Sequence, residues 1–82
     1  MSNAIPMTRA YEEIIDFIAA GTTPSTLIAF QPSETVKERV ADLIEREKYD
    51  GLAAEEKQEL DQYMILEHLI RLAKARAYQH LA

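Results

Sequence analysis

The sequence predicts an all-α fold: a small helical bundle built on an antiparallel helical hairpin, with an N-terminal helix and a short connecting helix. Apolar residues recur at helical spacing in three separate segments. The two glycines lie where such segments stop, and no segment alternates apolar and polar residues as a half-buried strand does. We expect residues 8–82 to form one helical domain, and residues 1–7 to be a disordered N-terminus or a cloning scar.

Length and composition restrict the class of protein. A domain of 82 residues buries only about 60–65% of its unfolded surface, so domains of this size are commonly stabilised by disulfides, metals or oligomerisation. The absence of cysteine excludes disulfides and thiolate metal sites, and it fits the reducing cytosol. Since the chain shows neither a secretory signal nor a long apolar run, we expect a cytoplasmic protein that oligomerises.

The first two helices are expected from their end signals. Thr8 can cap the first helix, and Gly21 can end it in a left-handed conformation. Thr23 and Pro24 then predict a short helix, because threonine caps helices and proline is favoured at the first helical position. Pro32 ends this helix, since the residue before a proline avoids helical angles.

A third helix is expected between Ser33, as its cap, and Gly51, as its stop. The charged side chains along it, Arg39 and Arg46 among them, are expected to face solvent. Its apolar residues lie at i, i+4, i+7 and i+8 and form one stripe: Val36, Val40, Leu43 and Ile44.

The last helix is expected to run from Ala53 or Ala54 to Leu81, antiparallel to the third. Its start lacks a side-chain cap, because alanine offers no acceptor to the first N–H groups. The acidic residues near this start, including Glu59, suit the positive end of the helix dipole. At about 100° per residue, this helix carries two apolar stripes: Tyr63, Leu66, Ile70, Ala73, Ala77 and Leu81 in one, and Ile65, Leu69 and Leu72 in the other.

These two stripes predict a homodimer built on the last helix. The third helix can cover only one stripe, so the other is covered either by the first helix or by a second chain. A stable dimer should bury more than ~1,000 Å² in total. The candidate interface residues come from either stripe: Tyr63, Ile65, Leu66, Leu69, Ile70, Leu72, Ala73 and Ala77.

No pattern in the sequence indicates a reaction. The serines and threonines have capping roles, and two glycines cannot supply a phosphate-binding loop or a GxGxxG motif. His68 and His80 lie about 120° apart around the last helix, so they do not share a face. We therefore expect a protein that is not an enzyme, with no catalytic, cofactor-binding or metal-binding residue.

The formal net charge of −5 is unevenly distributed. Residues 1–66 carry a balance of −7, whereas residues 67–82 carry +2. An acidic body favours a basic protein partner, since opposite fields speed encounter, and disfavours nucleic acid and membrane surfaces. The alternative is a small dimeric nucleic-acid-binding regulator that uses the basic C-terminal end, through Arg71, Lys74 and Arg76.

Five segments of the hairpin form a pattern that can be compared with other proteins. They are Ile44-Glu45-Arg46-Glu47-Lys48, Gly51-Leu52, Glu55-Glu56-Lys57, Glu59-Leu60 and Leu66-Glu67-His68-Leu69-Ile70-Arg71-Leu72-Ala73-Lys74-Ala75-Arg76-Ala77. This pattern resembles the helical hairpin of small, largely uncharacterised all-helical bacterial proteins, mainly cyanobacterial, and the C-terminal parts of antitoxin-like proteins that bind a partner nuclease. The resemblance implies a non-enzymatic interaction module, an antitoxin-like or regulatory partner of a nuclease, and supplies no catalytic residue. The chain departs from the pattern at Ala53-Ala54, where Ser or Thr followed by Pro is usual.

Overall fold

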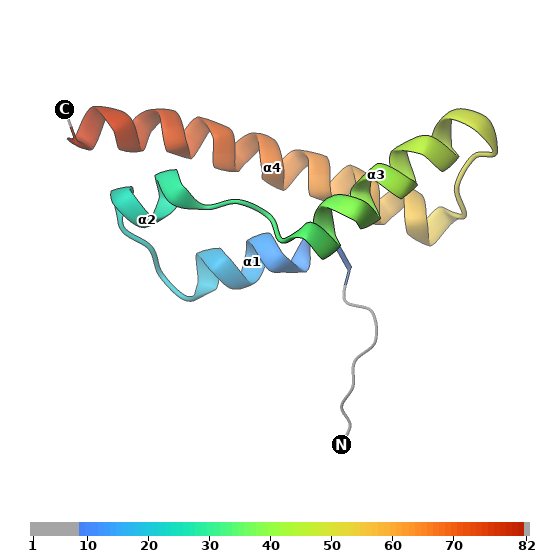
Figure 1. Ribbon diagram of the computed structural model, residues 1–82, viewed down its shortest axis with the longest axis horizontal. Helices are drawn as coiled ribbons and strands as arrows, with labels where there is room; N and C mark the ends of the chain where they lie inside the picture. Colours follow the sequence, from blue (N-terminus) through green and yellow to red (C-terminus); the bar gives the residue numbers. More distant parts are fainter. Residues whose placement is uncertain (1–8, 82) are drawn as a thin grey trace, which may run out of the picture.

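The computed structural model describes residues 9–81, and these form four helices and no strand (Figure 1). The helices are α1 (Glu12–Ala19), α2 (Pro24–Ala29), α3 (Glu34–Tyr49) and α4 (Ala54–Leu81). α3 and α4 form an antiparallel hairpin, and α1 and α2 lie on the same side of the long α4 (Figure 1). The predicted all-α bundle, with its hairpin, N-terminal helix and short connector, is confirmed.

Most helix ends follow the local signals in the sequence. Thr23 and Ser33 cap α2 and α3, and each hydroxyl oxygen accepts a hydrogen bond of 3.2 Å from the backbone N–H three residues later. Gly21 and Gly51 follow α1 and α3 with φ values of 86° and 79°. Glycine adopts this left-handed conformation without the steric cost of a side chain.

α1 begins later than the sequence predicts. Its first residue is Glu12, and the expected cap, Thr8, lies outside the described residues. The residues just before α1 form a turn instead of helix. This turn is closed by a hydrogen bond of 3.0 Å from the Glu12 N–H to the Arg9 carbonyl, and it is tied to α4 by a bond of 2.9 Å from the Ala10 N–H to Glu59 Oε2.

The core lies between α4 and the three shorter helices. Tyr63 and Ile70 of α4 pack with Ala10 and Ile14, and all four are buried. The rings of Phe17 and Phe30 pack against each other on the side of the core formed by α1 and α2, with centroids 4.3 Å apart. The partly buried apolar residues packed against this core are Tyr11, Phe17, Leu27, Phe30, Val36, Val40 and Leu66.

A buried carboxylate joins three segments of the chain. The side chain of Glu59 is 5% exposed. Its Oε1 accepts from Arg39 Nη2 at 2.8 Å, and its Oε2 accepts from Arg39 Nε at 3.1 Å as well as from Ala10. This fork-like geometry is the strongest form of a side-chain ion pair, and the hydrogen bonds from Arg39 lower the pKa of Glu59. The expectation that Arg39 faces solvent is therefore wrong, because the guanidinium turns inward to pair with this carboxylate.

A second arginine fixes the turn between α3 and α4. Arg46 donates to both oxygens of Glu56, at 3.1 and 2.7 Å, and to Asp42 Oδ2 at 3.1 Å. These hydrogen bonds lower the pKa of Glu56. Glu56 Oε1 also accepts from the backbone N–H of Ala53 at 3.3 Å. The start of α4 thus has half of a capping box, in which the acidic side chain bonds back to the first N–H.

Completing this capping box should stabilise the fold. Ala53 is the cap residue, because its carbonyl accepts the first helical hydrogen bond of α4, from Lys57 at 2.9 Å. A serine there can accept from the Glu56 N–H, so we expect Ala53→Ser to raise the free energy of unfolding by about 0.5–1 kcal/mol. Urea unfolding midpoints measure the change. Ala54→Ser is the matched control; a larger gain for that variant would place the helix start one residue later.

Removing the charge of Glu59 should cost far more than removing the charge of a partly exposed glutamate, Glu67. In Glu59→Gln, an amide group faces the three N–H donors that now share the carboxylate. We expect a loss of about 3–5 kcal/mol, as for a broken buried ion pair. Glu67→Gln is the control, because it breaks an exposed pair with Arg71 one helical turn away that contributes about 0.3–0.5 kcal/mol. Equal losses for the two variants would contradict a special role for Glu59.

The same ion pair predicts how stability depends on pH. The folded-state pKa of Glu59 is below its ordinary value, which is about 4.3 for an unfolded chain. Its contribution is therefore complete above that pH and is lost as the pH falls through the folded-state pKa. We expect the stability gap between the wild type and Glu59→Gln to narrow as the pH falls from about 6 to about 3. A gap that stays constant would show that this carboxylate does not titrate differently on folding.

Candidate interaction surface

One apolar row of α4 has no cover among the described residues. Ile65, Leu69 and Leu72 are 63%, 50% and 56% exposed, and we call them the outer row. At about 100° per residue, they lie on the side of α4 that faces away from Tyr63 and Ile70. Large apolar side chains that gather on one exposed face typically mark an interaction site.

The structure separates the two stripes that the sequence left as alternatives. The stripe that begins at Tyr63 packs inside the chain, and burial raises the pKa of the Tyr63 phenol. The first helix contributes to this same core and does not cover the outer row. Of the predicted interface residues, Tyr63, Ile70 and Ala77 are buried, Leu66 and Ala73 are partly buried, and Ile65, Leu69 and Leu72 are exposed; Leu81, at the end of the first stripe, is exposed as well.

Polar residues flank the outer row at both ends. Asp61 lies one helical turn before Ile65, and Arg76 lies one turn after Leu72. Both flanking side chains are exposed, and among residues 9–81 neither takes part in a salt bridge. Asp61 is not among the interface residues that the sequence predicts. Its spacing of four from Ile65 places the two residues on the same face of the helix and could have indicated it.

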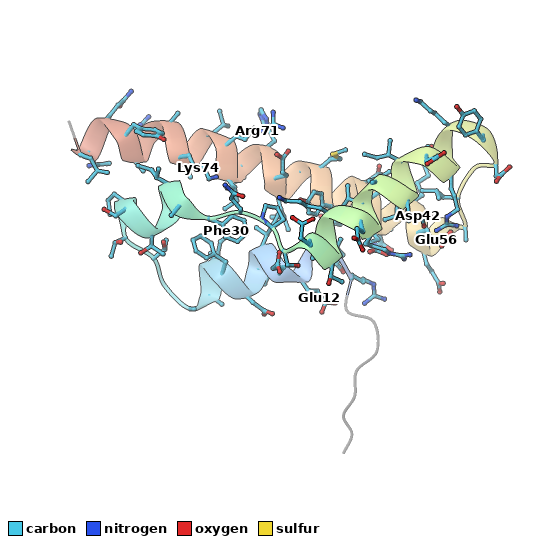
Figure 2. All side chains as sticks on the ribbon, in the orientation of Figure 1. Glu12, Phe30, Asp42, Glu56, Arg71 and Lys74 are labelled. Atoms are coloured by element: carbon cyan, nitrogen blue, oxygen red, sulfur yellow. The ribbon has the colours of Figure 1, made fainter. Side chains whose placement is uncertain are left out.

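The three basic residues proposed for nucleic acid do not form one patch. Arg71 donates to Glu67 Oε2 at 2.8 Å, and Lys74 Nζ donates to the carbonyl of Phe30 at 2.7 Å. In Figure 2, Lys74 reaches toward Phe30, whereas Arg71 points away from it. Arg76 lies beside the outer row, on a third side of the helix by helical spacing. The charges are therefore spread around α4.

Shallow hollows lie elsewhere on the surface of the described residues, and two of them are lined by residues of the helices. One, of about 300 Å³, lies between the start of α2 and the end of α4, with Leu27 and Ala77 in its floor and Arg76 and His80 at its rim. The other, of about 310 Å³, lies along α3 beside Tyr49.

Within residues 9–81 no three His, Asp or Glu side chains gather as metal ligands would. Nor does any helix in that range combine the length and apolar character that crossing a membrane requires.

Comparisons with known proteins identify no relative: no family model, curated protein or solved structure matches the chain.

Proposed function

We propose that the chain is a non-enzymatic protein–protein interaction module that forms a homodimer through the outer row of α4. The observation that carries the proposal is the exposure of Ile65, Leu69 and Leu72 on one face of a helix whose opposite face forms the core. Fully burying an exposed side chain of this kind contributes about 1.5–3 kcal/mol, and roughly half of that is available here because about half of each side chain is already covered in the single chain. A twofold contact buries six of them, which is the scale needed to offset the cost of association.

The two least exposed acidic groups of the α3–α4 pairing, Glu56 and Glu59, are engaged in holding the fold, which supports a role without chemistry. Glu59 and Glu56 both accept two hydrogen bonds from an arginine. Their pKa values are lowered, so they stay ionised near neutral pH and are poor general acids. A general acid at neutral pH would need the opposite shift.

A single charge in the outer row should abolish the dimer. Leu69→Lys places an ammonium group at the centre of the proposed contact, where burial without a partner is costly. We expect a monomer by light scattering at micromolar concentration, whereas the wild type is a dimer. Helical content measured by circular dichroism should not change, since Leu69 is half exposed in the single chain.

Tyr78→Lys is the matched control for this experiment. Tyr78 lies on the same helix and is 60% exposed, but by helical spacing it points away from the outer row. This variant should remain a dimer. A wild-type monomer, or a dimer that survives Leu69→Lys, would contradict the proposed interface.

We further propose a basic protein, such as a nuclease, as the partner of the dimer. Support comes from the exposed acidic side chains that are spread along α3 and into the start of α4, since opposite charge favours encounter and selects partners. These side chains are Glu34, Glu38, Asp42, Glu45, Glu47, Asp50 and Glu55.

Purification of the chain with its bound proteins from its host tests this partner. The captured protein should be basic, should lose nuclease activity when the chain is bound, and should be released by salt. Glu38→Lys combined with Glu45→Lys should weaken capture, because both side chains are exposed. Capture of an acidic protein, or of a nuclease that keeps its full activity, would contradict the assignment.

A further inference from the structure

We infer that the outer row pairs two copies of this chain in an antiparallel arrangement, α4 against α4, with the twofold axis passing between His68 and Leu69. This inference rests on the proposed homodimer and adds its orientation and register. It follows from how residue types are placed along the exposed side of α4.

The apolar residues are symmetric about the proposed axis. Ile65 lies three and a half residues before the midpoint between His68 and Leu69, and Leu72 lies three and a half residues after it. In an antiparallel pair centred there, Ile65 of each copy meets Leu72 of the other. Ile65 and Leu72 are both exposed in the single chain, so the contact needs no rearrangement of the fold.

The polar residues that flank the row follow the same symmetry. Asp61 and Arg76 are the next positions outward, each one helical turn beyond an apolar residue, and Gln58 and Gln79 lie beyond them. The antiparallel register therefore sets the carboxylate of one copy beside the guanidinium of the other, twice in each dimer. The two glutamines also meet, and amide side chains can donate and accept in turn.

Other arrangements lose this complementarity. A parallel pair sets Asp61 beside its own copy and Arg76 beside its own copy, which places like charges together and aligns the helix dipoles unfavourably. A shift of the antiparallel register by one helical turn sets Ile65 opposite Arg76, or Leu72 opposite Asp61. Of these arrangements, only the centred register pairs both Ile65 with Leu72 and Asp61 with Arg76; Leu69 of each copy then lies beside the axis, opposite His68 of the other copy.

The fold leaves this side of α4 open along most of its length. α1 and α2 lie on one side of the helix (Figure 1), and both Gln58 and Gln79 are exposed. The distance between these two residues along the helix is about 32 Å at 1.5 Å per residue. A second long helix can therefore lie along the row, and at Arg76 it comes beside the hollow that this residue shares with the start of α2.

Cysteine cross-linking tests the orientation, and the chain contains no cysteine of its own to interfere. Asp61→Cys and Arg76→Cys are made separately, mixed to allow exchange of subunits, and treated with a short bis-maleimide reagent. We expect covalent dimers that contain one copy of each variant, and almost none from either variant alone. In a parallel dimer the two different cysteines lie about 22 Å apart along the helices, and each variant cross-links with itself.

The outcomes separate this inference from the proposed homodimer. Cross-linking within each variant alone overturns the antiparallel orientation but keeps the dimer. A dimer by light scattering that cross-links in no combination places the interface elsewhere and also overturns the inference. A wild-type monomer overturns both proposals. Circular dichroism checks that each variant keeps its helical content.

Charge reversal gives a second measurement. Asp61→Arg should raise the dimer dissociation constant about tenfold. The substitution occurs in both copies, so it replaces two attractive pairs with two repulsive ones. Arg76→Glu should do the same, and the double variant should return the constant to within about threefold of the wild-type value. High salt should reduce all three differences. A double variant that is weaker than either single variant would contradict the pairing of Asp61 with Arg76.

Discussion

The ion pair between Glu59 and Arg39 is the constraint on which the arrangement of the helices depends. A carboxylate this deeply buried is stable only where donors replace its hydration, and Glu59 has three of them, two from Arg39 and one from the backbone of Ala10. These bonds bring α3 and the segment before α1 to the same side of α4. The apolar contacts of Ile14 with Tyr63 follow from that placement.

Among residues 9–81, this placement leaves the other side of α4 uncovered. At 1.5 Å per residue, α4 is about 42 Å long, whereas α1 and α2 are about 12 and 9 Å long. The turn before α1 is held at Glu59. The two short helices and α3 therefore all pack on one side of the long helix, and none of them reaches the other side. The exposure of Ile65, Leu69 and Leu72 therefore follows from the position of the buried carboxylate of Glu59 and from the short length of α1 and α2.

The four helices and most of their ends could be predicted because they depend on local chemistry: Thr23 and Ser33 cap α2 and α3, and Gly21 and Gly51 follow the ends of α1 and α3. The start of α1 could not, because the turn before it is tied to Glu59, which is distant in the sequence. The choice of which α4 stripe is covered could not, because both stripes have the same spacing and a similar content of leucine and isoleucine. Glu59 was missed for a different reason. Its place near the start of α4 already had an explanation in the helix dipole, although its spacing of four from Tyr63 put it in line with the core stripe.

The net positive charge of residues 67–82 does not indicate a nucleic-acid site once the contacts of its basic side chains are known. Glu67 neutralises Arg71, and Lys74 is held by the carbonyl of Phe30, so the excess charge does not collect on one face as phosphate binding requires. Arg76 lies beside the outer row, as far from its centre as Asp61 on the opposite end. The charge asymmetry along α4 therefore favours a partner whose charges run in the reverse direction, and a second copy turned end to end provides one.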